Sequence, residues 1–181
     1  MFNSLFKWIY RREWEENRSM LENKYKQKEM RLNAKALENE RQYGLLKHIF
    51  LMNPNAMILG IGKNKKDEEL MAVLVGNVIY LYGERYQGMC GLPRILFEIN
   101  EANILEGKVK NIRISDVLIE DIDIGNGTVA MEALIKYAKI INVKYIAGEF
   151  SRVDDDHADR RKHYYEKFGF AIKDRTIRLD L

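Results

Sequence analysis

The pattern of apolar and polar residues divides the sequence into a helical start and a β-rich remainder. Residues 1–50 contain no proline and one glycine, Gly44, and are rich in residues that favour or tolerate helix. Their first turns repeat apolar side chains at the spacing of one helix face, Phe2, Phe6 and Ile9 among them. We therefore predict one long helix, or two in series, over residues 1–50.

The middle of this helical segment is much more polar than its start. Between residues 15 and 42 the larger apolar residues include Leu21, Tyr25, Leu32 and Leu37. They keep no sustained heptad repeat, so the sequence does not predict a coiled coil. Residues 1–50 also carry 11 Lys or Arg against 7 Asp or Glu. This surplus is small for a nucleic-acid-binding surface, and we interpret it as a solvated helix surface.

Short β-rich runs begin after Pro54. Apolar residues that alternate or cluster between turns predict strands at residues 56–61, 70–75, 77–82 and 94–99 and a long strand at 109–122. The remaining predictions are a helix at 128–141, a strand at 144–150, a helix at 155–168 closed by Gly169, and two terminal strands within 170–181. This order indicates an α/β or α+β fold. The expected organisation is a helical extension, residues 1–50, followed by one domain, residues 51–181.

Length and cysteine content limit the class of protein. The chain has 181 residues, enough for one substantial core beside a helical extension. Its single cysteine, Cys90, cannot form an intramolecular disulfide, and the first residues lack the apolar run of a secretory signal or membrane span. We therefore expect a cytoplasmic protein.

Two glycines mark the junction between the long predicted strand and the helix that follows it. In Gly125-Asn-Gly127 the glycines permit tight backbone geometry, and the first N–H groups of a helix have no partner within it. Those donors and the positive end of the helix dipole can hold a phosphate without a basic side chain. Glycine turns also often serve only chain reversal, so this motif alone does not establish a phosphate site.

A second motif, His163-Tyr-Tyr-Glu-Lys-Phe-Gly-Phe170, ends the last predicted helix. The strand, glycine turn and helix, followed by a strand and a helix with this ending, resemble the GNAT acetyltransferases over residues 109–175, about a third of the chain. The resemblance implies a GNAT-like mixed central sheet flanked by helices. It also implies an acetyl-CoA-dependent N-acetyltransferase that transfers an acetyl group to an amine by direct attack.

The family's pyrophosphate loop falls on Ile122-Asp-Ile-Gly125-Asn-Gly127 of this sequence. Both glycines match, whereas Ile122 stands where the family has Arg or Gln, which removes a polar contact but leaves the backbone donors. The preceding strand resembles the one that pairs with the pantetheine arm and points an N–H at the thioester carbonyl. The acetyl-CoA contacts that the resemblance implies are Val117, Leu118, Ile119, Gly125, Asn126, Gly127 and Thr128.

The tail motif places its tyrosine at Tyr165, with Tyr164 at the preceding aromatic position. In the family this hydroxyl is placed to protonate the departing CoA thiolate, so Tyr165 is the candidate general acid. The alternative is an aromatic anchor between the helix and the sheet. The family's Asn seven residues earlier is Ala158 here, which removes one CoA or water contact.

The reaction also needs a group that accepts a proton from the amine. Glu120 is the first candidate because it lies just before the loop on the predicted strand, and the others are Asp116, Asp121 and His157. An exposed carboxylate without a catalytic role is the alternative for each acidic residue. The family uses no single residue as its base, so the resemblance does not choose among them.

Metal sites fit the sequence less well. Asp154-Asp-Asp-His157 with His163 has no second cluster, and its aspartates more simply cap the following helix. A calcium loop that starts at Asp121 would need its glycine at another position than Gly125. We therefore predict no metal ligands.

The acceptor stays open between a small-molecule amine and a protein amine, because residues 51–108 do not match the family's usual opening. The departures at Ile122 and Ala158 support an alternative class, a non-catalytic module of the same fold that works through the N-terminal helix. That helix is expected to pack on its own domain, to form a homodimer or to contact another partner. Membrane contact through aromatic residues such as Trp8 and Trp14 is the weaker alternative.

Overall fold

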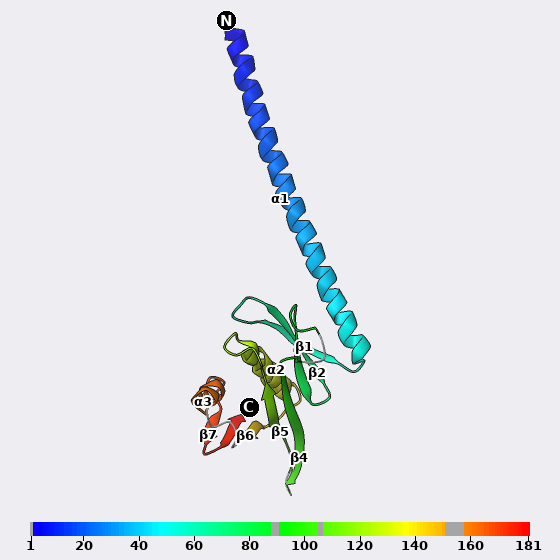
Figure 1. The fold of residues 1–181 in the computed structure, drawn as a ribbon, viewed down its shortest axis with the longest axis vertical. Coiled ribbons are helices and arrows are strands. Elements are labelled where there is room, and N and C mark those ends of the chain that lie inside the picture. The colour runs from blue at the N-terminus through cyan, green and yellow to red at the C-terminus, as the bar shows by residue number, and fades with distance from the viewer. Residues whose placement is uncertain (1, 88–90, 105–106, 151–157) are drawn as a thin grey trace. The chain divides into compact units, whose positions relative to one another are not determined.

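The computed structural model describes residues 2–87, 91–104, 107–150 and 158–181. The chain forms two compact units, one that ends at His48 and one from Ile49 to Leu181. Helix α1 (Phe2–Met52) accounts for the first unit, and its last residues belong to the second. The prediction of one long helix at the start of the chain is therefore confirmed, and Figure 1 shows it as one continuous element.

The second unit is an α+β fold built on one mixed sheet. Its eight strands have the order β1-β2-β3-β4-β5-β6-β8-β7. The strands are β1 (Met57–Lys63), β2 (Glu69–Val75), β3 (Val78–Tyr82), β4 (Arg94–Ile104), β5 (Gly107–Leu118), β6 (Tyr145–Glu149), β7 (Ala171–Lys173) and β8 (Thr176–Asp180). Strands β5 and β6 are parallel, and the other neighbouring pairs are antiparallel. The mixed α+β class predicted from the alternation of strands and helices is confirmed.

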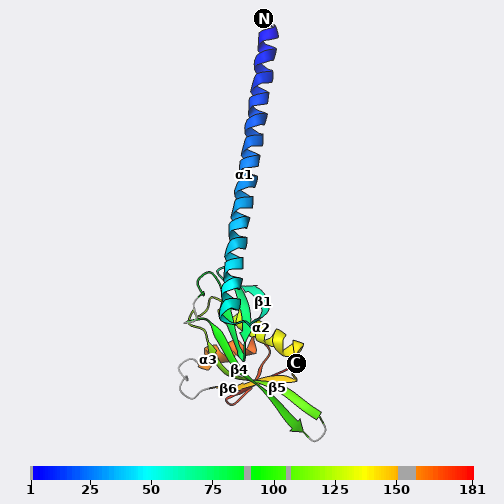
Figure 2. The same ribbon diagram turned by 90° about the vertical axis from the view of Figure 1, so that its right-hand side faces the viewer.

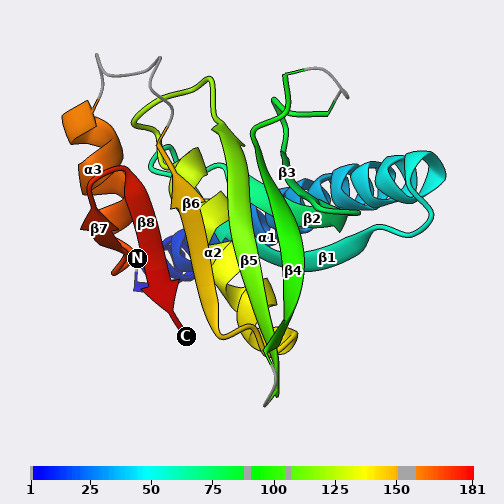
Figure 3. The same cartoon turned by 90° about the horizontal axis from the view of Figure 1, so that it is seen from below.

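Helix α2 (Asn126–Ile140) connects the two parallel strands and covers one face of the sheet, as Figure 3 shows. Its inward face consists of apolar residues at helical spacing, and it packs on strands β1 to β4 and β6. The buried apolar residues of α2 are Val129, Ala130, Met131, Ala133, Leu134 and Ala138. The helix begins two residues before the predicted start, because Gly125 adopts a left-handed conformation with φ of 96° and ends the loop there.

Strands β5 and β6 pair over only part of their length. Their register runs from Asn111 opposite Tyr145 to Ile114 opposite Gly148, and beyond it β5 pairs with β4 alone. The β4–β5 register shifts by one residue at this point, so Ser115 forms a bulge that bends β5. Strand β6 ends at Glu149, one residue after this pairing, whereas β5 continues along β4 to Leu118, and a cleft opens beside this end of β5.

The ends of β4 and β5 form a long hairpin. Figure 2 shows these two strands running together past their neighbours, and Asn100 to Ile104 of β4 pair with β5 over this stretch. Strand β4 therefore extends five residues beyond the predicted end at residue 99, whereas β5 ends at Leu118, four residues before the predicted residue 122.

The last helix, α3 (Ala158–Glu166), precedes the terminal strands and packs beside β7. Gly169 follows it with φ of 83°, and the Phe170 N–H bonds to the Tyr165 carbonyl 3.2 Å away, which closes the helix as predicted. The two terminal strands are confirmed as β7 and β8. Residues 151–157, which include the candidates Asp154 and His157, lie outside the described residues, as does Cys90.

No helix in the described parts of the chain is long and apolar enough to cross a membrane.

Candidate functional site

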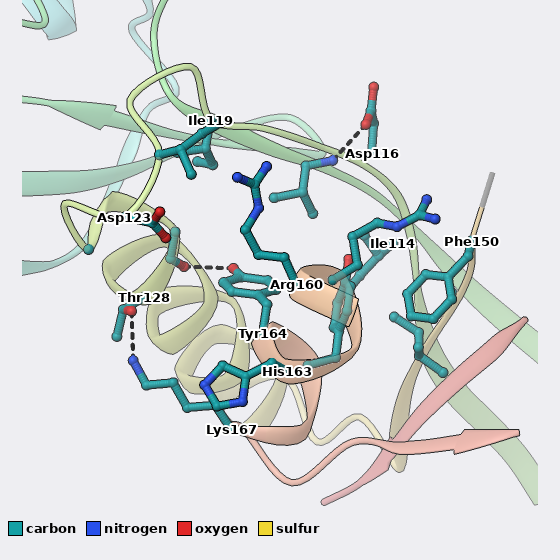
Figure 4. A pocket seen from close by; sticks show the side chains of 18 of the residues that line it. Ile114, Asp116, Ile119, Asp123, Thr128, Phe150, Arg160, His163, Tyr164 and Lys167 are labelled. Carbon is teal, nitrogen blue, oxygen red and sulfur yellow. Dashed lines mark hydrogen bonds between the residues drawn. The ribbon is translucent and has the colours of Figure 1, made fainter. Parts of the chain in front are cut away.

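A cleft of about 420 Å³ opens where β5 and β6 part. Its walls come from β5 and the loop after it, the start of α2, the end of β6 and one side of α3, as Figure 4 shows. The residues that line it are Lys65, Ile114, Ser115, Asp116, Val117, Ile119, Asp121, Ile122, Asp123, Gly125, Gly127, Thr128, Gly148, Glu149, Phe150, Arg160, Arg161, His163, Tyr164, Tyr165, Lys167 and Ile177. Segments from both ends of the domain therefore meet at one opening.

The start of α2 presents backbone donors to this cleft. No side chain of the described residues caps the helix at Gly125, and its first turn contains no acidic residue. The Thr128 and Val129 N–H groups bond back to the Gly125 carbonyl at 3.0 and 3.3 Å. The helix dipole adds positive potential at this end, so the loop is suited to bind an anion.

A buried polar network holds the loop in position. Asn126 is fully buried, and its amide oxygen accepts a hydrogen bond from Asn64 Nδ2 at 3.1 Å. Its own Nδ2 donates to the Tyr86 hydroxyl at 2.8 Å, and that hydroxyl donates to Asp121. The backbone N–H of Lys65 also donates to the Ile124 carbonyl at 2.7 Å. Residues of the β1–β2 turn and of the segment after β3 therefore hold the loop between β5 and α2 in position.

We expect Asn126→Ala to lower the free energy of unfolding by about 2–3 kcal/mol, because Asn64 and Tyr86 would each lose a buried partner. Urea unfolding measures this change. Asn100→Ala, at an exposed position on β4, is the matched control and should change the free energy by less than about 0.5 kcal/mol. Equal effects of the two substitutions would contradict a structural role for the network.

Helix α3 is fastened to the start of α2 by two side chains. The Tyr164 hydroxyl donates to the Gly127 carbonyl at 2.7 Å, and Lys167 Nζ donates to the Thr128 hydroxyl at 2.9 Å. Glycine at position 127 leaves room for this contact, since a Cβ there would lie 3.0 Å from the Tyr164 ring and the ring would have to move slightly. The second glycine of the predicted phosphate motif therefore also serves helix packing.

Basic side chains line the α3 side of the cleft. Arg160, His163 and Lys167 follow one another at helical spacing, and all three border the cleft and are exposed. Lys65 borders it from the β1–β2 turn. The cations Arg160, Lys167 and Lys65 share one opening with the start of α2, which is an arrangement suited to a ligand with several phosphate groups.

Tyr165 lies at the deep side of the cleft. It is 8% exposed, and its ring packs against those of Phe150 and Phe170 with centroids 5.6 and 5.3 Å away. Burial and, to a smaller extent, the Asp116 carboxylate raise the pKa of Tyr165 to about 12, against the opposing effect of Arg161. The hydroxyl is therefore protonated at neutral pH. The anchoring role and the general-acid role are both compatible with this position.

The candidate bases are distributed differently around the cleft. Asp116 lines it, is exposed, and accepts a hydrogen bond through Oδ1 from the Val117 N–H at 2.8 Å. Asp121 also lines it but accepts from Tyr86 and lies 4.0 Å from Arg85. Glu120 is exposed beside Gly91 and is not part of the described lining. Of the three, Asp116 is the carboxylate best placed to meet a substrate in the cleft.

Most of the predicted cofactor contacts meet in this cleft. Val117, Ile119, Gly125, Gly127 and Thr128 line it. Leu118, the last residue of β5, and Asn126, whose side chain is in the buried network, are not among the described lining residues. The Val117 N–H is bonded to Asp116, so a carbonyl could accept from it only after this carboxylate turns away.

Several residues of the site were not predicted from the sequence. The basic residues Arg160, His163 and Lys167 could have been found from their helical spacing, since two of them lie within the tail motif and Arg160 lies one turn before it. Asn64 and Tyr86 carry no such signal, because they reach Asn126 from 62 and 40 residues away in the chain.

Comparisons with known proteins add little to this geometry. No protein-family model and no curated protein sequence match the chain. Among solved structures, a mutant of the BH1408 protein from Bacillus halodurans is similar, with 22% sequence identity and a TM-score of 0.44. That match covers 59% of this chain and 67% of the other.

Proposed function

We propose that the chain is an acetyl-CoA-dependent N-acetyltransferase of the GNAT type, which transfers an acetyl group to a small-molecule or protein amine. The observation that carries the proposal is the cleft between the parted strands, in which the uncapped start of α2 and the buried Tyr165 lie on the same opening. The start of α2 is suited to bind phosphates, and Tyr165 is suited to donate a proton.

Phosphate binding is assigned to the start of α2 and the basic side chains beside it. The backbone N–H groups of Gly125 to Gly127 would hold the pyrophosphate, since that of Thr128 bonds to the Gly125 carbonyl, and the nearby cations Arg160 and Lys167 would offset its negative charge. Ile122 lines the cleft and supplies no polar group, so the backbone and α3 carry this binding. The residues present therefore fit a CoA pyrophosphate.

Acetyl-CoA would supply the acetyl group as a thioester, so that a C–N bond to the amine forms as the C–S bond breaks. Tyr165 would donate its proton to the departing sulfur, because its hydroxyl remains protonated at neutral pH. Asp116 would accept the proton that the amine nitrogen releases. The proton returns from Asp116 to Tyr165 afterwards, and the negative charge of Asp116 that raises the pKa of Tyr165 favours this return.

We infer that Asp116 is a better candidate for the base than Glu120. Asp116 borders the cleft and acts electrostatically on Tyr165, whereas the carboxylate of Glu120 lies beside Gly91. The carboxylate of Asp116 also leaves the Val117 N–H when it turns toward the amine, which frees that N–H for the thioester carbonyl. One side-chain rotation would thus prepare both groups.

The experiment that tests the cofactor site is titration calorimetry of acetyl-CoA and CoA with Thr128→Glu. A carboxylate in the first turn of α2 stabilises the helix through its dipole but repels a phosphate from the same donors. We expect the dissociation constants of both ligands to rise about tenfold or more, equivalent to about 1.4 kcal/mol. Gly127 is a poorer position for this test, because a larger residue there would also displace Tyr164.

Thr128→Val is the matched control, since it removes the hydroxyl that accepts from Lys167 without adding charge. Its affinity should change less than about threefold. Saturable binding that Thr128→Glu weakens and Thr128→Val retains would justify a screen of amine acceptors. If the unchanged protein binds neither ligand at roughly millimolar concentration, the acetyltransferase proposal is wrong.

A further inference from the structure

Helix α1 carries exposed apolar side chains that repeat every eleven residues. Tyr10, Leu21, Leu32 and Tyr43 are eleven positions apart, and their exposed fractions are 68%, 52%, 59% and 71%. Trp14 and Tyr25 repeat the same spacing four residues further on, at 61% and 69%. Together we call these six side chains the apolar row.

The apolar row follows one face of a straight helix. A helix turns about 100° per residue, so eleven residues complete three turns with a drift of only about 20°. Positions four residues apart are offset by about 40°, so the whole row occupies an arc of about 60°. Figures 1 and 2 show α1 as the straight helix that this geometry requires. A search for a seven-residue repeat misses the row because its period is eleven.

Charged residues flank the apolar row, with glutamates on one side and a group of basic residues on the other. On one side, which we call the acidic flank, are Glu15, Glu22, Glu29 and Glu40, all exposed. On the other side, the basic flank, are Lys24, Lys28, Arg31 and Lys35, also all exposed. Arg11 and Arg18 lie on the acidic flank as well and form ion pairs with Glu15 and Glu22 at 3.4 and 2.8 Å, so Glu29 and Glu40 are the carboxylates of this flank that the proposal uses. An apolar row between flanks of opposite charge is the arrangement of a helix that pairs with another helix.

A second copy of the same helix fits this surface. Two helices with the same eleven-residue repeat keep their apolar faces together along their whole length. In a parallel pair, the acidic flank of each helix faces the basic flank of the other, whereas an antiparallel pair would bring like charges together. Lys24 and Lys35 each precede a glutamate of the acidic flank by five residues, Glu29 and Glu40. That offset suits ion pairs between parallel helices.

We propose that the apolar row is a dimerisation surface, and that its partner is α1 of a second copy of this chain in parallel orientation. Covering the row removes aromatic and aliphatic surface from water, which a helix exposed all round cannot do alone. This proposal is independent of the acetyltransferase proposal.

Sedimentation equilibrium of the full chain tests the association. We expect a dimer. Leu32→Glu should raise the dissociation constant of this dimer about tenfold or more, because each chain then places one carboxylate in the apolar interface. Leu37→Glu is the matched control: it makes the same change at a residue that is 54% exposed and points away from the row. This control should leave the dissociation constant within about threefold of the original.

Disulfide cross-linking tests the orientation in a Cys90→Ser background, since Cys90 is the only cysteine. Leu21→Cys should cross-link to itself, because identical positions meet in a parallel pair. An antiparallel pair would instead cross-link Leu21→Cys chains with Leu32→Cys chains. Only the self-cross-link agrees with the proposal.

Charge reversal tests the flanks. Replacing Lys24 and Lys35 by Glu should weaken the dimer about tenfold, and adding Glu29→Lys and Glu40→Lys to that variant should restore it. A monomer at all concentrations, an antiparallel cross-link or the absence of restoration would overturn the proposal. Flotation of a monomer with anionic vesicles would assign the apolar row to a membrane surface, and would overturn it too.

Discussion

Replacing Tyr165 by phenylalanine is expected to lower kcat about 100-fold or more, because the variant cannot donate a proton to the departing sulfur. The ring contacts with Phe150 and Phe170 stay in place, so the melting temperature and the affinity for acetyl-CoA should change little. Steady-state kinetics with an amine found in the acceptor screen measures kcat, and titration calorimetry measures the affinity.

Tyr164→Phe is the matched variant at the neighbouring aromatic position. The Tyr164 hydroxyl is committed to the Gly127 carbonyl, so its loss should loosen the loop and weaken acetyl-CoA binding by a few-fold rather than lower kcat. The opposite outcome, with kcat reduced by Tyr164→Phe and retained by Tyr165→Phe, would show that Tyr165 is only the aromatic anchor.

Asp116→Asn is also expected to reduce kcat about 100-fold or more at neutral pH, because the amide cannot accept the proton from the amine. The amide oxygen can still accept the hydrogen bond from the Val117 N–H, so the local structure of β5 should remain. Asp116→Glu should restore part of the activity, since it returns a carboxylate to the cleft.

Glu120→Gln distinguishes this assignment from the one based on sequence. The carboxylate of Glu120 is exposed outside the described lining of the cleft, so the substitution should leave kcat within about twofold. A large loss with Glu120→Gln and none with Asp116→Asn would transfer the role of base to Glu120. Both variants change one charge, so their general electrostatic effects are comparable.

The parts of the fold that depend on local pattern could be predicted. Helix α2 follows from apolar residues at helical spacing such as Leu134 and Ala138, and the turn after α3 contains Gly169 because its positive φ suits glycine. The glycine turn and the tail motif lie beside one cleft, so the residues chosen from them mostly share one site. The GNAT resemblance itself stays a proposal.

The parts that depend on distant contacts could not be predicted. The pattern of the predicted strand continues through Ile119 and Ile122, but β5 ends at Leu118. After Leu118 the backbone no longer pairs with a neighbouring strand, and the Ile124 carbonyl instead accepts a hydrogen bond from the Lys65 N–H. The bulge at Ser115, which decides where the cleft opens, is a matter of register with β4 and leaves no mark in the sequence. The position of Glu120 was misjudged for this reason.

The helix α1 shows how the choice of period limits a sequence-based prediction. Its length followed from composition, since residues 1–50 lack proline and contain one glycine. The apolar row on its surface was not predicted, because Leu21 and Leu32 do not fit a heptad repeat but do fit a repeat of eleven residues. Both apolar side chains are exposed in the structure, which indicates that the eleven-residue repeat lies on the helix surface.

The contact between Gly127 and Tyr164 constrains which residues these two positions can carry together. A side chain at position 127 and the ring at position 164 compete for the same space, since a Cβ would lie 3.0 Å from the ring. The two positions should therefore covary: descendants that acquire a larger residue at 127 should carry a smaller one at 164. A smaller residue at position 164 would come first in such a lineage, because it leaves room for the Cβ at position 127.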